Sequence, residues 1–302
     1  MAFPRQYRLR AGTRSVILAG MKKILITGLL LAAPALAQDP LTAPIDCDDC
    51  AKWNEAARPV PLYGNSTYVG VGGLSSVLVA TEKGLILFDG DLTQSAPLIE
   101  ANIRSLGYRI ENIKYILVSH EHFDHVAGVA ALKRDSGATV LAGAEAAKAL
   151  GQGHATATDP QSNDRGYPAV AGVETVTDGQ TISLGDVTVT AHRTPGHTPG
   201  GTSWSWKSCE KGKCLDMVYA DSLTAFSTAP GYRFTPVAQS FKASIAKVRA
   251  LPCDLLVTTH PGASNFWQRA EKGSLIAPDA CRTLADRAEA ALDKRLADEK
   301  AK

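Results

Sequence analysis

The sequence predicts an α/β (α+β) protein in which two β-sheets pack face to face with helices on the outside, an αββα sandwich. One observation and one physical rule lead to this prediction. Strand-like segments are followed by a helix, a short buried strand and a further helix, and this order occurs twice along the chain. A sheet or helix with one apolar face must bury that face against another layer. The repeated order therefore favours two sheets, each covered by its own helices.

The first half begins with four strand-like segments separated by Gly-Asn, Gly-Gly and Lys-Gly turns, at 61–63, 67–69, 76–79 and 85–88. A helix is expected over about 93–106, where apolar residues recur at helical spacing. Residues 115–118 form an apolar run without alternation, as expected of a strand buried on both faces. Another helix is expected over about 125–135.

The second half has strand-like segments near 173–193 and 202–220, a helix at about 237–250 and a buried strand at 255–257. A charged helix is expected over about 279–300. The polar segment 151–170 separates the two halves. A loop of that length in a compact domain is usually functional or mobile.

Residues 1–37 are interpreted as a signal peptide. Met21-Lys22-Lys23 supplies a positive start, an apolar run follows, and Ala35-Leu36-Ala37 is an A-x-A cleavage signal before Gln38. The apolar run is too short for a membrane span, which needs roughly 20 residues. Translation is expected to start at Met21; the alternative is a buried N-terminal helix. We expect residues 38–302 to form a single domain, periplasmic or secreted, in a bacterium.

Removing residues 1–37 changes the net charge of the chain. The rest of the chain holds 26 basic and 30 acidic residues, a net charge of −4. No basic stripe remains for nucleic acid, and no second apolar segment suggests a membrane partner. We therefore expect a monomer that acts on a small molecule.

The six cysteines are an even number in a chain that we expect to be exported. An oxidising compartment favours disulfides. Proximity favours Cys47–Cys50 and Cys209–Cys214, although six cysteines allow 15 pairings. Cys47 and Cys50 could instead form a redox or metal pair. No thioredoxin-like βαβ pattern and no second C-x-x-C accompanies them, so a structural disulfide is favoured.

The strongest chemical signal is the run 119–125, Ser-His-Glu-His-Phe-Asp-His, directly after a buried strand. Imidazole and carboxylate groups together are typical zinc ligands. In an extended loop, residues two apart project to the same side, so His120 and His122 can bind one ion. Asp124 and His125 can reach a second ion. The alternative is a polar surface loop with chance histidines, but three of the chain's seven histidines lie here.

Two ions need further ligands, and two more histidines follow strand-like segments. His197 lies in a Pro/Gly-rich loop, and His260 follows the strand at 255–257. Either alone would more often be a structural histidine, but together with the first cluster they are predicted ligands. His192, inside a strand pattern, and His154, in the polar loop, are not assigned to metal.

These motifs, H-x-H-x-D-H, T-P-G-H-T and T-H-P, resemble those of the metallo-β-lactamase superfamily over most of residues 38–302. The stretches 63–70, 73–75, 87–90, 195–204 and 219–224 resemble the subclass B3 enzymes in particular, as does the late pair Cys253–Cys281. The resemblance implies the metallo-β-lactamase fold. It also implies a class B β-lactamase that hydrolyses the β-lactam amide of penicillins, cephalosporins and carbapenems with a zinc-activated hydroxide.

The same resemblance implies roles for individual residues. His120, His122 and His197 would bind the first of two Zn²⁺ ions; Asp124, His125 and His260 would bind the second, and Asp124 would also take part in proton transfer. Ser222 and Thr224, with Gln161, would hold the β-lactam substrate. Ser222 stands where the first subclass has a cysteine ligand.

Two alternatives remain open at this point. Asp221 also resembles the bridging aspartate of glyoxalase-type and lactonase-type members, so the chain could hydrolyse lactones or thioesters with the same metals. The second alternative is a zinc-holding or scaffold protein that catalyses no reaction. Three protein ligands per ion argue against this alternative, because they leave open coordination positions, as in catalytic rather than structural zinc sites.

Overall fold

The computed structural model describes residues 38–301, so the predicted signal peptide and the predicted start at Met21 lie outside the described residues. No helix within the described part is long and apolar enough to cross a membrane.

Seven strands form the first sheet, in the same order as along the chain. They are β1 (Val60–Tyr63), β2 (Ser66–Tyr68), β3 (Val77–Thr81), β4 (Gly84–Phe88), β5 (Ile113–Leu117), β6 (Thr139–Gly143) and β7 (Glu174–Val176). The pairs from β1 to β4 are antiparallel, and those from β4 to β7 are parallel. Parallel neighbours need long crossovers, and helices lie within the connections β4–β5, β5–β6 and β6–β7.

Five strands form the second sheet, in the order β12-β11-β10-β9-β8. They are β8 (Thr181–Leu184), β9 (Val187–Arg193), β10 (Thr202–Glu210), β11 (Lys213–Ala220) and β12 (Leu255–Thr258). Only the pair β11–β12 is parallel. Helix α6 lies in the crossover between these two strands.

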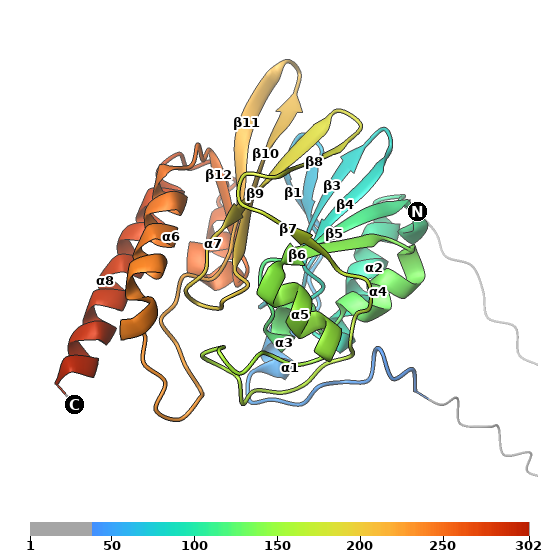
Figure 1. Ribbon diagram of the computed structural model, residues 1–302. Helices are drawn as coiled ribbons and strands as arrows, with labels where there is room; N and C mark the ends of the chain where they lie inside the picture. Colours follow the sequence, from blue (N-terminus) through green and yellow to red (C-terminus); the bar gives the residue numbers. More distant parts are fainter. Residues whose placement is uncertain (1–37, 302) are drawn as a thin grey trace, which may run out of the picture. The chain divides into compact units, whose positions relative to one another are not determined.

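The helices are α1 (Cys50–Trp53), α2 (Ala96–Ser105), α3 (Phe123–Val126), α4 (Val129–Ser136), α5 (Ala144–Gln152), α6 (Ala238–Ala250), α7 (Phe266–Glu271) and α8 (Ala280–Lys300). Short 3-10 turns occur at η1 (Thr93–Ser95), η2 (Ile110–Asn112), η3 (Thr235–Val237) and η4 (Pro261–Ser264). In Figure 1, α2, α4 and α5 lie on the outer side of the first sheet, and α6 and α8 lie on the outer side of the second.

Alternation along the strands produces the layers. On β3, Val77 and Val79 face the second sheet, whereas Leu78 packs in the apolar cluster that also contains Ile99 of α2 and Val129 of α4. The middle cluster joins the two sheets and includes Phe88 on one side and Trp204 and Trp206 on the other. A third cluster joins β11 and β12 to α6 and α8. The predicted αββα sandwich is confirmed.

Some elements differ from the prediction. The helix expected at 125–135 is two helices, α3 and α4, with a break at Ala127 and Gly128. A Cβ on Gly128 would overlap with the carbonyl oxygens of Gly90 and Leu92, so the close packing of this segment on the β4–α2 connection requires glycine. Strand β6 and helices α5 and α7 were not predicted.

Three disulfides are present, Cys47–Cys50, Cys209–Cys214 and Cys253–Cys281, which are the predicted pairs. The second joins paired residues of the hairpin β10–β11. The third joins the segment before β12 to α8. The helix that closes the second sheet is thus covalently attached to the chain just before the strand it covers.

Candidate metal centre

The histidine-bearing segments follow the carboxyl ends of β5, β9 and β12. Asp89, which follows β4, fixes the first of these segments: its carboxylate accepts hydrogen bonds from the Ser119 amide at 2.7 Å and from the Ser119 hydroxyl at 2.6 Å. Tyr219 of β11 donates to the same carboxylate at 2.8 Å. Both sheets therefore set the position at which the 119–125 run begins.

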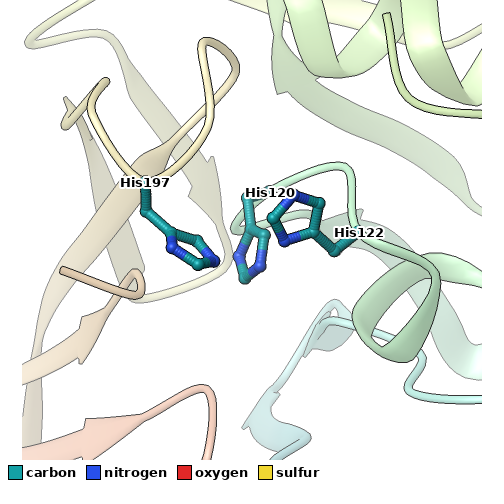
Figure 2. Close-up of side chains that lie close together, drawn as sticks. All are labelled: His120, His122 and His197. Carbon is teal, nitrogen blue, oxygen red and sulfur yellow. The ribbon is translucent and has the colours of Figure 1, made fainter. Parts of the chain in front are cut away.

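His120, His122 and His197 form one group whose nitrogen atoms lie within 4.8 Å of one another. All three rings are buried, and their centroids are 4.8 to 5.0 Å apart at nearly perpendicular angles. Figure 2 shows the three rings converging on one point from two separate loops. Such an arrangement of imidazoles is suited to one tetrahedral metal ion with a free fourth position.

The outward nitrogens of two of these rings have protein partners. His120 Nδ1 lies 2.9 Å from Asp221 Oδ1, and His197 Nδ1 donates to the Thr224 carbonyl oxygen at 2.8 Å. In each case Nε2 is the nitrogen left for a metal. His120 Nε2 is buried and has no hydrogen-bond partner among the described residues. A buried polar atom without a partner is costly unless it binds something.

His122 offers the opposite nitrogen. Its Nε2 lies 2.9 Å from Asp159 Oδ1, and its Nδ1 lies 3.1 Å from the Gln161 side-chain nitrogen. Because a carboxylate accepts and an amide donates, Nε2 carries the proton and Nδ1 carries the lone pair. Both partners belong to the predicted functional loop at 151–170.

Asp124, His125 and His260 form a second group beside the first. The two Nε2 atoms are 3.2 Å apart, and each lies 3.2 Å from Asp124 Oδ2. His260 Nδ1 donates to the Gly73 carbonyl at 3.2 Å, which fixes that ring as well. Asp124 lies in the first turn of α3 rather than just before the helix expected at 125–135, and the structure brings its carboxylate together with His125 and His260.

Charges within the second group determine its protonation. Burial alone would raise the pKa of Asp124, but the neighbouring His125 and His260 lower it well below the usual range. Burial alone would lower the pKa of His260, but Asp124 raises it. In the first group, burial and the neighbouring histidines lower the pKa of His197 to about 3. A neutral imidazole, as at His197, and an ionised carboxylate, as at Asp124, are the forms that bind metal cations.

Glu121 connects the two loops that carry the first group. Its side chain is fully buried, and it accepts hydrogen bonds from the Thr198 hydroxyl at 2.8 Å and from the Gly200 amide at 3.0 Å. It projects away from His120 and His122 because successive residues of an extended segment face opposite sides. Burial, with a contribution from Asp159, raises the pKa of Glu121 to about 7.

A cavity of about 940 Å³ opens onto both groups. Its lining includes all three predicted substrate residues, Gln161, Ser222 and Thr224. The Ser222 hydroxyl lies 2.8 Å from the Thr259 hydroxyl, and the Thr224 hydroxyl lies 2.9 Å from His197 Nδ1. The remaining wall includes Trp53, Phe226 and residues of α8, with Arg287 among them.

Asp221 lies outside both groups of converging ligand atoms. Besides its contact with His120, it accepts hydrogen bonds from the Ser222 amide at 2.8 Å and from the Thr194 hydroxyl at 3.3 Å. Its carboxylate thus supports a predicted ligand and the loop after β9.

Sequence reasoning missed three acidic residues of this centre. Asp89, Glu121 and Asp159 are all buried, and each contacts a segment that carries a predicted ligand. Glu121 could have been suspected, because a carboxylate between two histidines that face a metal must point into protein. Asp159 had a weaker signal, its position two residues before Gln161.

Comparison with known proteins shows which class this fold and site define. Residues 69–260 match the family described as the metallo-beta-lactamase superfamily. The chain belongs to this superfamily, whose fold and metal-dependent hydrolase chemistry are those expected from the sequence.

Solved structures narrow the similarity to one subclass. The Rm3 metallo-beta-lactamase is 45% identical, with a TM-score of 0.82 over 85% of this chain and 100% of that chain. MEM-A1, a subclass B3 metallo-beta-lactamase isolated from a soil metagenome library, is also 45% identical, with a TM-score of 0.79 over 82% of this chain and 99% of that one. The chain thus resembles subclass B3 metallo-β-lactamases, as predicted.

Curated relatives carry other names. A hydroxyacylglutathione hydrolase of Brucella anthropi is 26% identical over 162 residues, 54% of this chain and 51% of that protein. The chain spans about half the length of this curated relative, which leaves the substrate to be argued from the site.

Proposed function

We propose that this protein is a two-zinc β-lactamase of subclass B3, which hydrolyses the amide of penicillins, cephalosporins and carbapenems. The observation that carries the proposal is the pair of ligand groups at the base of one cavity, with hydroxyl and amide side chains placed around it. The similarity to B3 enzymes over nearly their full length supports the same substrate class.

The residues present fit zinc. Five imidazoles and one carboxylate are borderline ligands of the kind that zinc prefers. His120, His122 and His197 would hold one ion, and Asp124, His125 and His260 the other. Zinc at such a site acts as a Lewis acid and lowers the pKa of water to about 7, so that a nucleophile exists at neutral pH.

The chain's own residues would bind and orient the substrate. The Thr224 hydroxyl can accept a hydrogen bond from His197 Nδ1, and the Ser222 hydroxyl can accept one from the Thr259 hydroxyl. The protons of the Thr224 and Ser222 hydroxyls are then free to be donated to the substrate carboxylate. Asp124 is ionised, so the carboxylate oxygen that does not face the ion would first accept a proton and then pass it to the amide nitrogen that leaves. The Gln161 amide can contact the substrate from the opposite loop.

The alternative substrate is a lactone or thioester, and the curated relatives favour it. That alternative rested on Asp221 as a possible bridging ligand. Asp221 Oδ1 instead faces His120 Nδ1 at 2.9 Å, behind the ring, which removes the residue-level argument for it.

The test is steady-state hydrolysis of one penicillin, one carbapenem, an acyl-homoserine lactone and a glutathione thioester, with zinc content measured in the same sample. We expect turnover of both β-lactams, its loss with EDTA and its return with zinc. His120→Ala should lose metal and rate together. The matched control is His192→Ala, since His192 contacts Ser205 away from the site. Full β-lactam hydrolysis in metal-free protein, or turnover of the lactone or thioester alone, would contradict the proposal.

We further propose that residues 38–302 act as a single exported domain, monomeric and located in the periplasm or outside the cell. Three disulfides in a chain of this size support an oxidising compartment.

A further inference from the structure

Asp159 is a buried carboxylate in the segment between α5 and β7, and it is not one of the six residues of the two ligand groups. Its side chain is fully buried. Its Oδ1 lies 2.9 Å from His122 Nε2 and accepts a hydrogen bond from the Gln161 amide at 2.7 Å. Backbone hydrogen bonds from Asp159 to Thr156 and from Ser162 to Asp159 hold the turn in place. The carboxylate is therefore fixed relative to the loop, and the His122 ring is fixed relative to the carboxylate.

The protein places this carboxyl group in its interior with few other partners. Asp159 Oδ2 is buried without a hydrogen-bond partner among the described residues. Burying a carboxylate is costly unless it is paired. The side chain that pairs with Asp159 is His122, so this ring offsets the free-energy cost of burying the carboxyl group.

The contact determines which nitrogen of His122 is free. His120 and His197 use Nδ1 for their protein partners, whereas His122 uses Nε2. If His122 carried its proton on Nδ1, one of the three nitrogens that His120, His122 and His197 offer to an ion would be an N–H and could not bind it. The Gln161 amide, 3.1 Å from Nδ1, independently marks that nitrogen as the acceptor. Outer carboxylates that receive the other N–H of a ligand histidine generally fix its tautomer and raise its basicity.

We propose that Asp159 is a positioning residue for the metal centre, which holds the proton of His122 on Nε2 so that Nδ1 faces the ion. The inference rests on the proposed metal-dependent function, although metal binding can be measured without any substrate. It also gives the 151–170 loop a defined role. The oxygen that orients His122 also holds the Gln161 backbone, so the loop that lines the cavity is anchored to a metal ligand.

The experiment compares Asp159→Asn, Asp159→Ala and the control Asp164→Asn in the full chain. Asp164 lies in the same loop and lines the same cavity, but it makes no hydrogen bond to a histidine of either group. The affinity of each zinc equivalent is measured by competition with a chromophoric chelator. The visible spectrum of the Co²⁺-substituted protein reports on the ligands, and thermal melts of metal-free samples report on folding.

We expect Asp159→Ala to weaken one of the two zinc equivalents by about 10- to 100-fold, the usual effect of removing such a partner. The Co²⁺ spectrum of that site should change, and the other equivalent should keep its affinity. Asn has the shape of Asp and still accepts from Nε2–H, so Asp159→Asn should fold like the original protein and show a smaller loss of zinc affinity. Asp164→Asn should bind both ions normally.

Other outcomes overturn the proposal. If Asp159→Asn and Asp159→Ala bind both ions with unchanged affinity and an unchanged Co²⁺ spectrum, Asp159 only stabilises the loop. If Asp159→Ala fails to fold and Asp159→Asn binds both ions normally, the conclusion is the same. Failure of β-lactam hydrolysis in the original chain, with the zinc effect present, would reject the proposed substrate and leave this inference standing.

Discussion

His120 Nδ1 and Asp221 Oδ1 lie 2.9 Å apart, and both side chains are fully buried. Burial raises the pKa of Asp221 well above its usual value and lowers that of His120 well below. The charge of Asp124 favours protonated His120, and the Ser222 amide and Thr194 hydroxyl favour ionised Asp221, but burial has the larger effect on both pKa values. A cation bound at His120 Nε2 would stabilise the ionised form of Asp221 across the ring, so the pair is most stable when the metal is present.

The first prediction concerns this pair. Asp221→Ala should weaken zinc binding by the group of His120, His122 and His197 by about 10- to 100-fold, because the ring loses the partner that orients it. Asp221→Asn retains an acceptor oxygen and should lose less. Zinc content after dialysis against a weak chelator measures both. Equal loss of both zinc ions from Asp221→Asn would instead indicate that Asp221 bridges the metals.

The second prediction concerns Gln161. Its side-chain nitrogen lies 3.1 Å from His122 Nδ1, and a lone pair cannot accept that hydrogen bond and bind zinc at once. In the zinc-loaded protein the amide should therefore turn to the cavity and contact the substrate. Gln161→Ala should raise KM about five-fold, the effect of one hydrogen bond of about 1 kcal/mol, with little change in kcat.

Zinc content in Gln161→Ala should equal that of the original protein, because Gln161 is not a ligand. His154→Ala is the matched control, since His154 is exposed in the same loop and contacts its neighbour's carbonyl. A fall in kcat with unchanged KM would place Gln161 in the chemical step and contradict a binding role.

The third prediction concerns the buried link made by Glu121. Glu121→Ala leaves the Thr198 hydroxyl and the Gly200 amide without an acceptor. Each buried unsatisfied group costs about 1–3 kcal/mol, so the free energy of unfolding should fall by that amount or more. Glu121→Gln should be much milder, because Gln keeps one acceptor and a Thr hydroxyl can accept from its amide. Urea unfolding of chelator-treated protein measures the difference, and equal stability of Glu121→Ala and the original chain would show that this link is dispensable.

The convergence of the six side chains could be predicted from the sequence because most of the necessary information is local. Four of the six predicted ligands lie within residues 120–125, directly after a buried strand. The other two, His197 and His260, also follow strands. The strand pattern likewise predicted the sandwich, since the unbroken apolar run at 115–118 indicates a strand that is buried on both faces.

The supporting residues could not be predicted because their contacts are distant in sequence. His122 and Asp159 are 37 positions apart, and Glu121 and Gly200 are 79 apart. The position of Asp159, two residues before Gln161, is a weak local signal, because its loop holds several other polar residues. Strand β6 and helix α5 were missed for a different reason: both are short, and they follow one another without a turn signal between them.

Glu299, near the end of α8, also makes contacts that are distant in sequence and could not be predicted from it. The last prediction concerns this residue. A charged helical segment predicts a solvated face, but the Glu299 side chain is only 7% exposed. Its carboxylate accepts hydrogen bonds from the Phe234 amide at 2.8 Å, from the Thr235 amide at 3.0 Å and from the Thr235 hydroxyl at 2.7 Å. It thereby holds the far end of the 221–234 segment, which carries Ser222 and Thr224.

Burial alone would raise the pKa of Glu299, but these hydrogen bonds and Arg295 lower it from 4.5 to about 2. A carboxylate whose pKa is lower in the folded state stabilises the fold above its unfolded pKa, and that contribution is lost as the pH falls from 4.5 towards 2. Glu299→Gln should therefore cost about 1–3 kcal/mol at pH 7, the value of hydrogen bonds to a charged group, and the difference from the original chain should vanish near the folded pKa.

Urea unfolding of both proteins between pH 7 and the acid range, with metal removed from both, measures this difference directly. Asp293→Asn is the matched control on the same helix, because Asp293 and Lys242 form an exposed ion pair of the kind that contributes less than about 1 kcal/mol. If the stability difference for Glu299→Gln were constant across the range, the carboxylate's charge would not be what stabilises this end of the 221–234 segment. The hydrogen bonds would then act through geometry alone, and the hydroxyls of Ser222 and Thr224 would keep their positions in acid.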